Sequence, residues 1–284
     1  MTSTSPKPSR PIDPAIVVVL RAVHATAVAQ RLEFFVAGAL ARDIWLDYIY
    51  GVPAARLTRD IDIGIHVSSW AEFHALRARL IADAGFVPDV HRIHRLRMAS
   101  SGVPLDIVPF GGVEDKARRI AWPPDGSTVM TLLGFAEVFA AAPYLELAPR
   151  LRVRVTHLAG LAALKLLSWS ERGRETNRDA VDFWMIVRHY GDPCHRERLL
   201  LEEDEMLAAE AYDVGRAGAR LLGLDIGRVL GDKGAALLNE MIDAELDNTR
   251  PQRLIGVILY PTAEESEYLE CQQLLGAVAR GLKM

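Results

Sequence analysis

The sequence predicts an α+β fold, in which an N-terminal domain with a mixed sheet is followed by a mostly helical C-terminal domain. Up to about residue 155, short apolar stretches at the strand period are interleaved with helical stretches, whereas beyond it helical spacing dominates. At 284 residues the chain is long enough for two modest domains. We therefore expect domains over 12–155 and 156–284, preceded by a disordered tail over 1–11 that is rich in Ser and Pro.

Local signals predict the elements in chain order. Asp13-Pro14 can open a helix, with Asp as the N-cap and Pro in the first turn. Gly38 separates a short buried strand over 34–36 from a helix over 39–50. The alternation of Ile and Asp in 60–65 has the period of a half-buried strand. The other expected elements are helices over 69–84, 158–170 and 176–190, strands over 93–98, 103–108 and 151–155, and helix in most of the remainder.

Composition places the chain among ordinary globular proteins, because half of the residues are apolar and a quarter are charged. Cys194 and Cys271 lie far apart and outside any ligand spacing, which predicts neither disulfides nor zinc and favours the reducing cytoplasm. The apolar run over 16–20 ends at Arg21, too soon to span a bilayer, so no membrane association is expected.

Charge is unevenly distributed along the chain. The net charge of −4 argues against a strong general affinity for nucleic acid. Between residues 150 and 178, however, there are seven basic and two acidic residues. A weakly acidic protein can still carry one concentrated basic surface.

The most specific chemical feature is the pair of acids Asp60 and Asp62. Residues two apart in a strand face the same side, so both carboxylates emerge together while Ile61 and Ile63 enter the core. Two carboxylates on one face favour a bound cation, and Mg²⁺ takes one or two carboxylates plus substrate phosphates. The alternative is a solvated acidic edge, which an isolated pair of this kind would favour.

Two further residues support a metal-assisted site. Gly38 opens a helix, where unpaired backbone N–H groups can receive a triphosphate. Asp106 is the one acid in an otherwise apolar strand, where an unpaired charge is costly. Beside the first strand it would supply a third carboxylate, and three carboxylates suit a site for two metal ions.

Lys165 stands in an otherwise apolar helix, fourteen residues before Asp179. Asp182 follows Asp179 at the helical i, i+3 spacing. The alternatives are a solvated surface lysine and a surface ion pair between Arg178 and Asp182.

These residues together resemble the DNA polymerase beta-like nucleotidyltransferases, and within them the AbiEii/AbiGii toxin group. The resemblance covers roughly residues 33–190. The family pattern of Gly-Gly/Ser, Arg-x-Ser/Thr-x-Asp-x-Asp, a lysine-bearing helix and Arg/Lys-Asp-x-x-Asp stands here as Gly38-Ala39, 56–62 (Arg-Leu-Thr-Arg-Asp-Ile-Asp), Lys165 and 178–182 (Arg-Asp-Ala-Val-Asp).

The resemblance implies the polymerase beta-like nucleotidyltransferase fold for the N-terminal domain and a set of roles. Mg²⁺ (or Mn²⁺) would bind Asp60 and Asp62, with Asp106 as a further ligand, and Lys165 and Asp179 would complete the catalytic set. The nucleotide would contact Gly38, Ala39, Thr58, Lys165 and Asp182. Because Ala39 replaces the usual Gly or Ser, backbone N–H groups or Thr58 would have to contact the phosphates there.

The expected activity is a metal-dependent transfer of an NMP from an NTP onto an acceptor, with release of pyrophosphate. The resemblance implies an RNA acceptor, with the tRNA 3′ end as one possibility, and a toxin with a cognate antitoxin protein. One alternative is a small-molecule nucleotidyltransferase of the aminoglycoside type, which should carry an acidic acceptor pocket. The other is an inactive binding relative, which the joint presence of the acids and Lys165 argues against.

Basic residues two apart in predicted strands are the candidate acceptor-binding surface. The alternative is a solvated strand edge that charges guard against aggregation, whereas the functional interpretation is a surface that contacts phosphates. The residues are Arg95 and Arg97 in one strand and Arg150, Arg152 and Arg154 at another.

Overall fold

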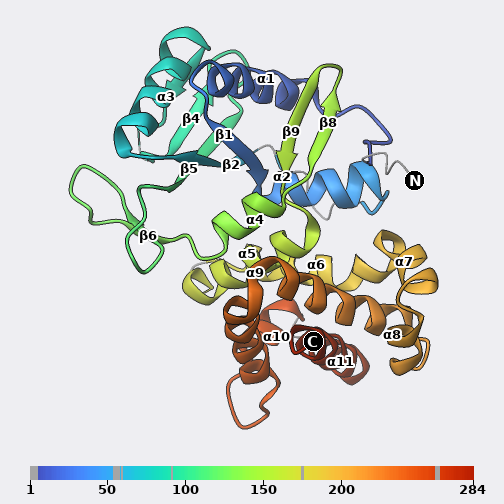
Figure 1. The fold of residues 1–284 in the computed structure, drawn as a ribbon. Helices are drawn as coiled ribbons and strands as arrows, with labels where there is room; N and C mark the ends of the chain where they lie inside the picture. The colour runs from blue at the N-terminus through green and yellow to red at the C-terminus, as the bar shows by residue number, and fades with distance from the viewer. Residues whose placement is uncertain (1–5, 54–57, 59, 91, 174–175, 260–262) are drawn as a thin grey trace. The chain divides into compact units, whose positions relative to one another are not determined.

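The computed structural model describes residues 6–53, 58, 60–90, 92–173, 176–259 and 263–284. The chain divides into two compact units, Met1–His157 and Leu158–Met284. The first combines helices with a seven-stranded mixed sheet, and the regular elements in the described part of the second are helices. This confirms the α+β fold class that the sequence predicts (Figure 1).

The sheet of the first unit has the strand order β3-β4-β5-β2-β1-β9-β8. The pairs β5/β2 and β1/β9 are parallel, and the other neighbours are antiparallel. The strands are β1 (Glu33–Ala37), β2 (Ile61–Val67), β3 (Phe86–Pro88), β4 (Arg95–Met98), β5 (Pro104–Gly111), β8 (Tyr144–Ala148) and β9 (Leu151–Val155), and a separate pair is formed by β6 (Arg119–Ala121) and β7 (Val129–Thr131).

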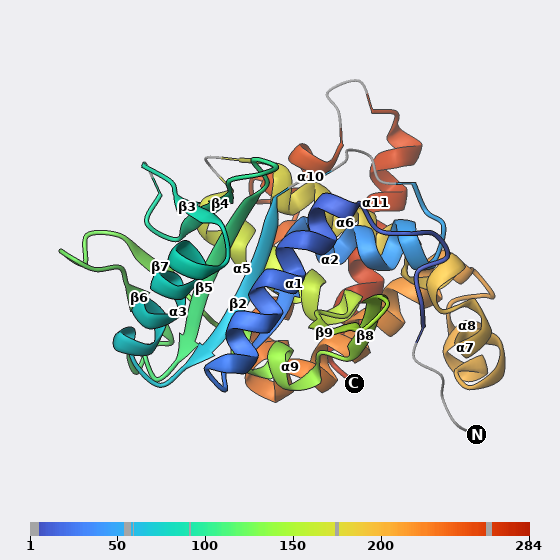
Figure 2. The same cartoon turned by 90° about the horizontal axis from the view of Figure 1, so that it is seen from above.

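Helices cover both faces of this sheet. Figures 1 and 2 show α1 (Pro14–Ala29) and α3 (Trp70–Asp83) on one side, and they contact β1, β2 and β9. The face with α4 (Phe135–Ala141) carries the aromatic rings of Phe35, Phe110 and Phe139, whose centroids lie 5.3–5.9 Å apart. The central strands are therefore covered on both sides.

The caps of α1 and α3 follow the predicted chemistry. The Asp13 side chain accepts a hydrogen bond from the backbone N–H of Ala15 at 2.8 Å, and Pro14 stands in the first turn. The Ser69 hydroxyl accepts from the backbone N–H of Glu72, whose carboxylate in turn accepts from the N–H of Ser68.

Two predicted segments differ in the structure. The helix expected over 39–50 is α2 (Gly38–Asp43), which continues directly as the π-helix η1 (Ile44–Ile49). In the tail that we expected to be disordered, Ser9 donates from both N–H and hydroxyl to the carbonyl of Tyr48, and Arg10 pairs with Asp47. Contacts with η1 thus hold the described end of the tail.

The second unit is built around a close crossing of α9 and α11. A Cβ on Gly223 or on Gly281 would meet backbone atoms of the opposite helix, so both positions need glycine for the helices to pack. No helix in the described part of the chain is long and apolar enough to cross a bilayer. The helices are α5 (Leu158–Arg172), α6 (Arg178–His189), η2 (Tyr190–Cys194), α7 (Arg196–Leu201), α8 (Asp204–Ala209), α9 (Val214–Leu246), α10 (Arg253–Ile258) and α11 (Glu265–Leu282).

Candidate active site

The strand register of the first unit brings two of the predicted acids side by side. Asp62 of β2 is the direct neighbour of Asp106 in the parallel pair with β5, and of Ala37 in the antiparallel pair with β1. Register partners point to the same face, which here is the face with α4, because Gly64, two residues after Asp62, is the partner of Phe35, whose ring packs on Phe139 of α4. Asp60 directly precedes β2, and its side chain is 46% exposed.

Gly38 lies directly against Asp62. Its φ of +63° is in the left-handed region that favours glycine. A Cβ at this position would overlap the Asp62 carboxylate. Glycine is therefore required here twice, by its backbone conformation and by the close approach of the acid. Ala39, the residue that departs from the family pattern, is buried and offers no polar side-chain atom.

Asp106 has a partner that the sequence analysis did not assign. The Arg95 guanidinium donates from Nε to Oδ1 at 2.7 Å and from Nη2 to Oδ2 at 2.6 Å, and Nη2 also lies 3.6 Å from Oδ2 of Asp60. The hydrogen bonds with Asp106 raise the pKa of Arg95 above its ordinary value, although burial acts in the opposite direction. We expected Asp106 to be a metal ligand and Arg95 to belong to an acceptor-binding surface, and the structure pairs the two side chains with each other.

The short loop between the two predicted strands indicates that Arg95 and Asp106 lie opposite each other. At the β4–β5 connection the N–H of Met98 donates to the carbonyl of Val103. Counting back from this pair places Leu96 opposite Leu105 and Arg95 opposite Asp106. A tight connection between the predicted strands 93–98 and 103–108 sets that register, because loop length fixes the pairing in a hairpin.

Two of the predicted acids offer oxygens that suit Mg²⁺. Asp60 and Asp62 are oxygen donors of the type that Mg²⁺ takes, and two of them suffice when substrate phosphates supply the rest. Both oxygens of Asp106 are engaged by Arg95. Within the described residues, no group of three or more His, Cys, Asp or Glu side chains is arranged to hold a metal ion. The residues thus fit a two-carboxylate metal site, and Asp106 as a ligand stays a prediction.

The second unit holds Lys165 between two acids. Its Nζ lies 2.9 Å from Oδ1 of Asp179 and 2.7 Å from Oδ2 of Asp182, and the Asp182 side chain is 1% exposed. Burial would lower the pKa of Lys165, but the charges of Asp182 and Asp179 outweigh it and raise that pKa. Neither a solvated lysine nor a surface pair of Arg178 with Asp182 describes this buried cluster.

The predicted basic surface separates into exposed and structural arginines. Arg150 lies in the turn before β9 with a φ of +61°, and both it and Arg152 are exposed. The Arg154 guanidinium donates to the carbonyls of Phe139 and Ala142 and lies over the rings of Phe139 and Tyr144. Arg154 is thus a packing residue of the first unit.

The remaining predicted positions are Arg97 and Thr58. Arg97, on the same face of β4 as Arg95, donates from Nε to Asp89 at 3.0 Å. Thr58 is half-buried. Its sequence neighbours 54–57 and 59, which include Arg56 and Arg59 of the family pattern, lie outside the described residues.

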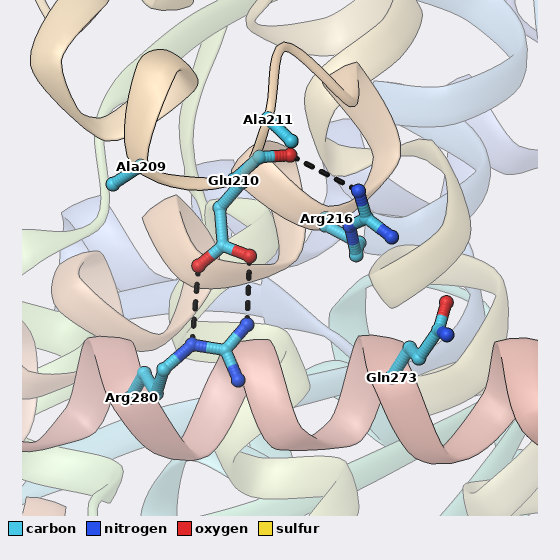
Figure 3. A pocket seen from close by; sticks show the side chains of 6 residues that line it. All are labelled: Ala209, Glu210, Ala211, Arg216, Gln273 and Arg280. Atoms are coloured by element: carbon cyan, nitrogen blue, oxygen red, sulfur yellow. Dashed lines mark hydrogen bonds and ion pairs between the residues drawn. The ribbon is translucent and has the colours of Figure 1, made fainter.

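A cavity of about 290 Å³ in the second unit is lined by none of the predicted site residues (Figure 3). The buried carboxylate of Glu210 accepts from Nε and Nη2 of Arg280 at 3.1 and 2.7 Å, and the Glu210 carbonyl accepts from Arg216. Both arginines of the cavity are thus engaged with Glu210, which makes an ion-pair network at the surface of the second unit the simplest description of the cavity. The lining residues are Ala209, Glu210, Ala211, Arg216, Gln273 and Arg280.

Comparison with known protein families gives one match over most of the chain. Residues 20–256 match the family model described as nucleotidyl transferase AbiEii toxin, type IV toxin–antitoxin system. No curated protein sequence matches the chain.

Solved structures similar to the chain include two kinds of enzyme. A solution structure of the antibiotic-resistance factor ANT(2″)-Ia is 15% identical, with a TM-score of 0.36 and coverage of 70% of this chain and 98% of that one. A crystal structure of ANT(2″)-Ia in complex with adenylyl-2″-tobramycin is 14% identical, with a TM-score of 0.35 and coverage of 72% and 97%. The Thermotoga maritima CCA-adding enzyme complexed with tRNA is 15% identical, with a TM-score of 0.26 and coverage of 91% and 66%.

Proposed function

Because this chain belongs to the nucleotidyl transferase AbiEii toxin family and is therefore a nucleotidyltransferase, we propose that it moves an NMP from an NTP onto RNA with a divalent metal ion held by Asp60 and Asp62. The family description supports a nucleotide substrate and a type IV toxin–antitoxin system. As part of the proposal, the chain acts as the toxin of such a system, with a cognate antitoxin protein.

The observation that carries the proposal is the contact between Gly38 and Asp62. A turn without a side chain lies directly against the half-buried carboxylate of Asp62 near the start of β2, and a Cβ there would overlap the acid. Such an arrangement lets triphosphate oxygens approach backbone N–H groups and a carboxylate-bound cation at once. Asp60, half-exposed at the start of the same strand, supplies the second carboxylate.

The chain's own residues position the reactants in this proposal. Gly38 and Ala39 present backbone N–H groups to the phosphates, and Asp62 and Asp60 are the ligands for Mg²⁺ or Mn²⁺. When bound, the metal ion neutralises phosphate charge during the transfer. The acceptor hydroxyl gives its proton to solvent water as its oxygen bonds to the α-phosphorus and the bond to the leaving pyrophosphate breaks, and the chain contributes positioning and charge neutralisation.

The buried cluster of Lys165, Asp179 and Asp182 is the part of the proposal that lies in the second unit. Lys165 is proposed to contribute to triphosphate binding, with Asp179 and Asp182 holding its ammonium group in one position. The distances of 2.9 and 2.7 Å support the holding role. We therefore expect both carboxylates to affect activity through the orientation and charge of Lys165.

The RNA acceptor is supported by the exposed guanidinium groups of Arg150 and Arg152. Both belong to the β8–β9 hairpin, and neither is buried in the structure. Binding of a polyanion through such groups depends steeply on salt, with a log–log slope of about −0.7 for each phosphate contacted on a single strand. A small-molecule acceptor would show little of this dependence.

The test of the acceptor uses RNA binding across a salt series. Replacing Arg150 and Arg152 with Gln should flatten the slope by about 1.4, since two phosphate contacts are lost. The double variant Arg79→Gln/Lys116→Gln is the control, because it removes two exposed positive charges of the first unit that lie outside the predicted acceptor-binding residues. Parallel lines for the wild type and the double variant, together with label transfer from an NTP to an aminoglycoside but not to RNA, would refute the RNA acceptor and favour the small-molecule alternative.

A further inference from the structure

Arg95 is the centre of a compact charge cluster in the first unit. One guanidinium engages both oxygens of Asp106, at 2.7 and 2.6 Å, and reaches toward Asp60 at 3.6 Å. The side chains of Arg95 and Asp106 are only 11% and 13% exposed. Bidentate pairs of this kind are among the stronger and more directional ionic interactions in proteins.

Backbone pairing stabilises the same contact. Arg95 and Asp106 are directly opposite each other in the antiparallel pair of β4 and β5, and Asp106 is in turn the neighbour of Asp62 on β2. The guanidinium therefore reaches Asp106 without a long excursion of its side chain. It is placed by the sheet register, on the same face as the carboxylate of Asp62.

This pairing has a consequence for any cation at the site. A metal ion that used Asp106 as a ligand would have to displace the guanidinium, and breaking a mostly buried ion pair is costly because a charge is left without its partner. Arg95 and Asp106 together are neutral, and Asp60 and Asp62 are the carboxylates next to this pair. The described residues accordingly contain no three-ligand metal cluster.

Resting on the proposed metal-dependent function, we infer that Arg95 is a positioning residue that keeps Asp106 out of the metal coordination shell. Asp60 and Asp62 are then the protein ligands, and the Arg95 guanidinium is a permanent positive charge in the place where a third carboxylate would otherwise recruit a further ion. The site takes one divalent cation through protein ligands, not two.

The experiment measures the affinity of the full-length chain for Mn²⁺ alone, from the signal of free Mn²⁺ in electron paramagnetic resonance. In the double variant Arg95→Gln/Asp106→Asn, a neutral pair replaces a pair of opposite charges, so affinity should stay within about threefold of the wild type. Arg95→Gln alone removes a cation and releases Asp106, so affinity should rise about tenfold or more. Melting curves establish that each variant is folded.

Arg97→Gln is the matched control, because Arg97 lies two residues along the same face of β4 and pairs with Asp89 outside the carboxylate row. Its Mn²⁺ affinity should equal that of the wild type. If Arg95→Gln alone does not fold, the double variant decides, since Gln and Asn can still form a hydrogen bond.

A loss of affinity of about tenfold or more in the double variant, with wild-type binding intact, would show that Asp106 is a metal ligand and would overturn the inference. An Arg95→Gln variant that folds but binds no more tightly would overturn it as well. Equal, weak binding by the wild type and by Asp62→Asn would instead refute the metal dependence itself, and the inference would fall with it.

Discussion

Gly38→Ala is the substitution with the largest consequence worked out from the geometry. An alanine at a φ of +63° costs about 1–2 kcal/mol relative to glycine, because its Cβ crowds the neighbouring carbonyl oxygen. Its methyl group would also overlap the Asp62 carboxylate, and overpacking of this kind costs about 1–3 kcal/mol. We expect the free energy of unfolding of the first unit to fall by about 2–5 kcal/mol, or Asp62 to move.

Gly51→Ala separates these two contributions. Gly51 has a similar φ of +74°, but a Cβ there would meet nothing within 4 Å. That variant should lose only the conformational part, about 1–2 kcal/mol, and keep its activity. In Gly38→Ala, a shift of Asp62 by about 1 Å should lower the rate about a hundredfold.

Urea denaturation and transfer of a radiolabelled nucleotide to RNA give the two readouts. Equal stability of the two variants together with a fully active Gly38→Ala would refute the reasoning that the glycine is required by its approach to Asp62.

Three further predictions concern other parts of the chain. Lys165→Met should destabilise the second unit by about 3–5 kcal/mol, because Asp179 and Asp182 would be left buried without the ammonium group. The midpoint of urea denaturation measures this loss, and an unchanged midpoint would show that Lys165 has no such structural role. Since the pKa of Lys165 is raised, its contribution to stability should be complete below pH 10.5 and disappear as the pH rises through the raised value, so the wild type and Lys165→Met should converge only in strong alkali. Arg154→Gln should lower the melting temperature while Arg152→Gln does not, because only the first removes hydrogen bonds to carbonyls; equal melting temperatures would contradict this.

The elements that could be predicted from sequence are those with strong local signals. The alternation of Ile61, Ile63 and Ile65 determines which face of β2 is buried, and it predicts the strand and the direction of Asp62 together. The Ser69 cap likewise marks the start of α3. In contrast, β3 and β6 have three residues each, too few for a periodic pattern to be read.

Side-chain pairing was harder to predict than position. The partners Arg95 and Asp106 lie in different strands, so their contact depends on register and not on any local motif. The sequence left the surface alternative open for Lys165, because the acids that surround it come from the next helix along the chain. Arg154 belonged to an apparent basic stripe, but packing against rings and carbonyls of α4 and its flank makes it structural.

The central claim is that Asp62 acts in nucleotide transfer through a divalent metal ion. The direct measurement is transfer of label from each α-³²P-labelled NTP to total RNA, with Mg²⁺ or with chelator, for the wild type, Asp62→Asn and the control Asp125→Asn, an exposed acid elsewhere in the first unit. We predict label on RNA only with Mg²⁺, for the wild type and Asp125→Asn but not for a folded Asp62→Asn. Transfer that persists in chelator, or at the wild-type rate in Asp62→Asn, would contradict the account.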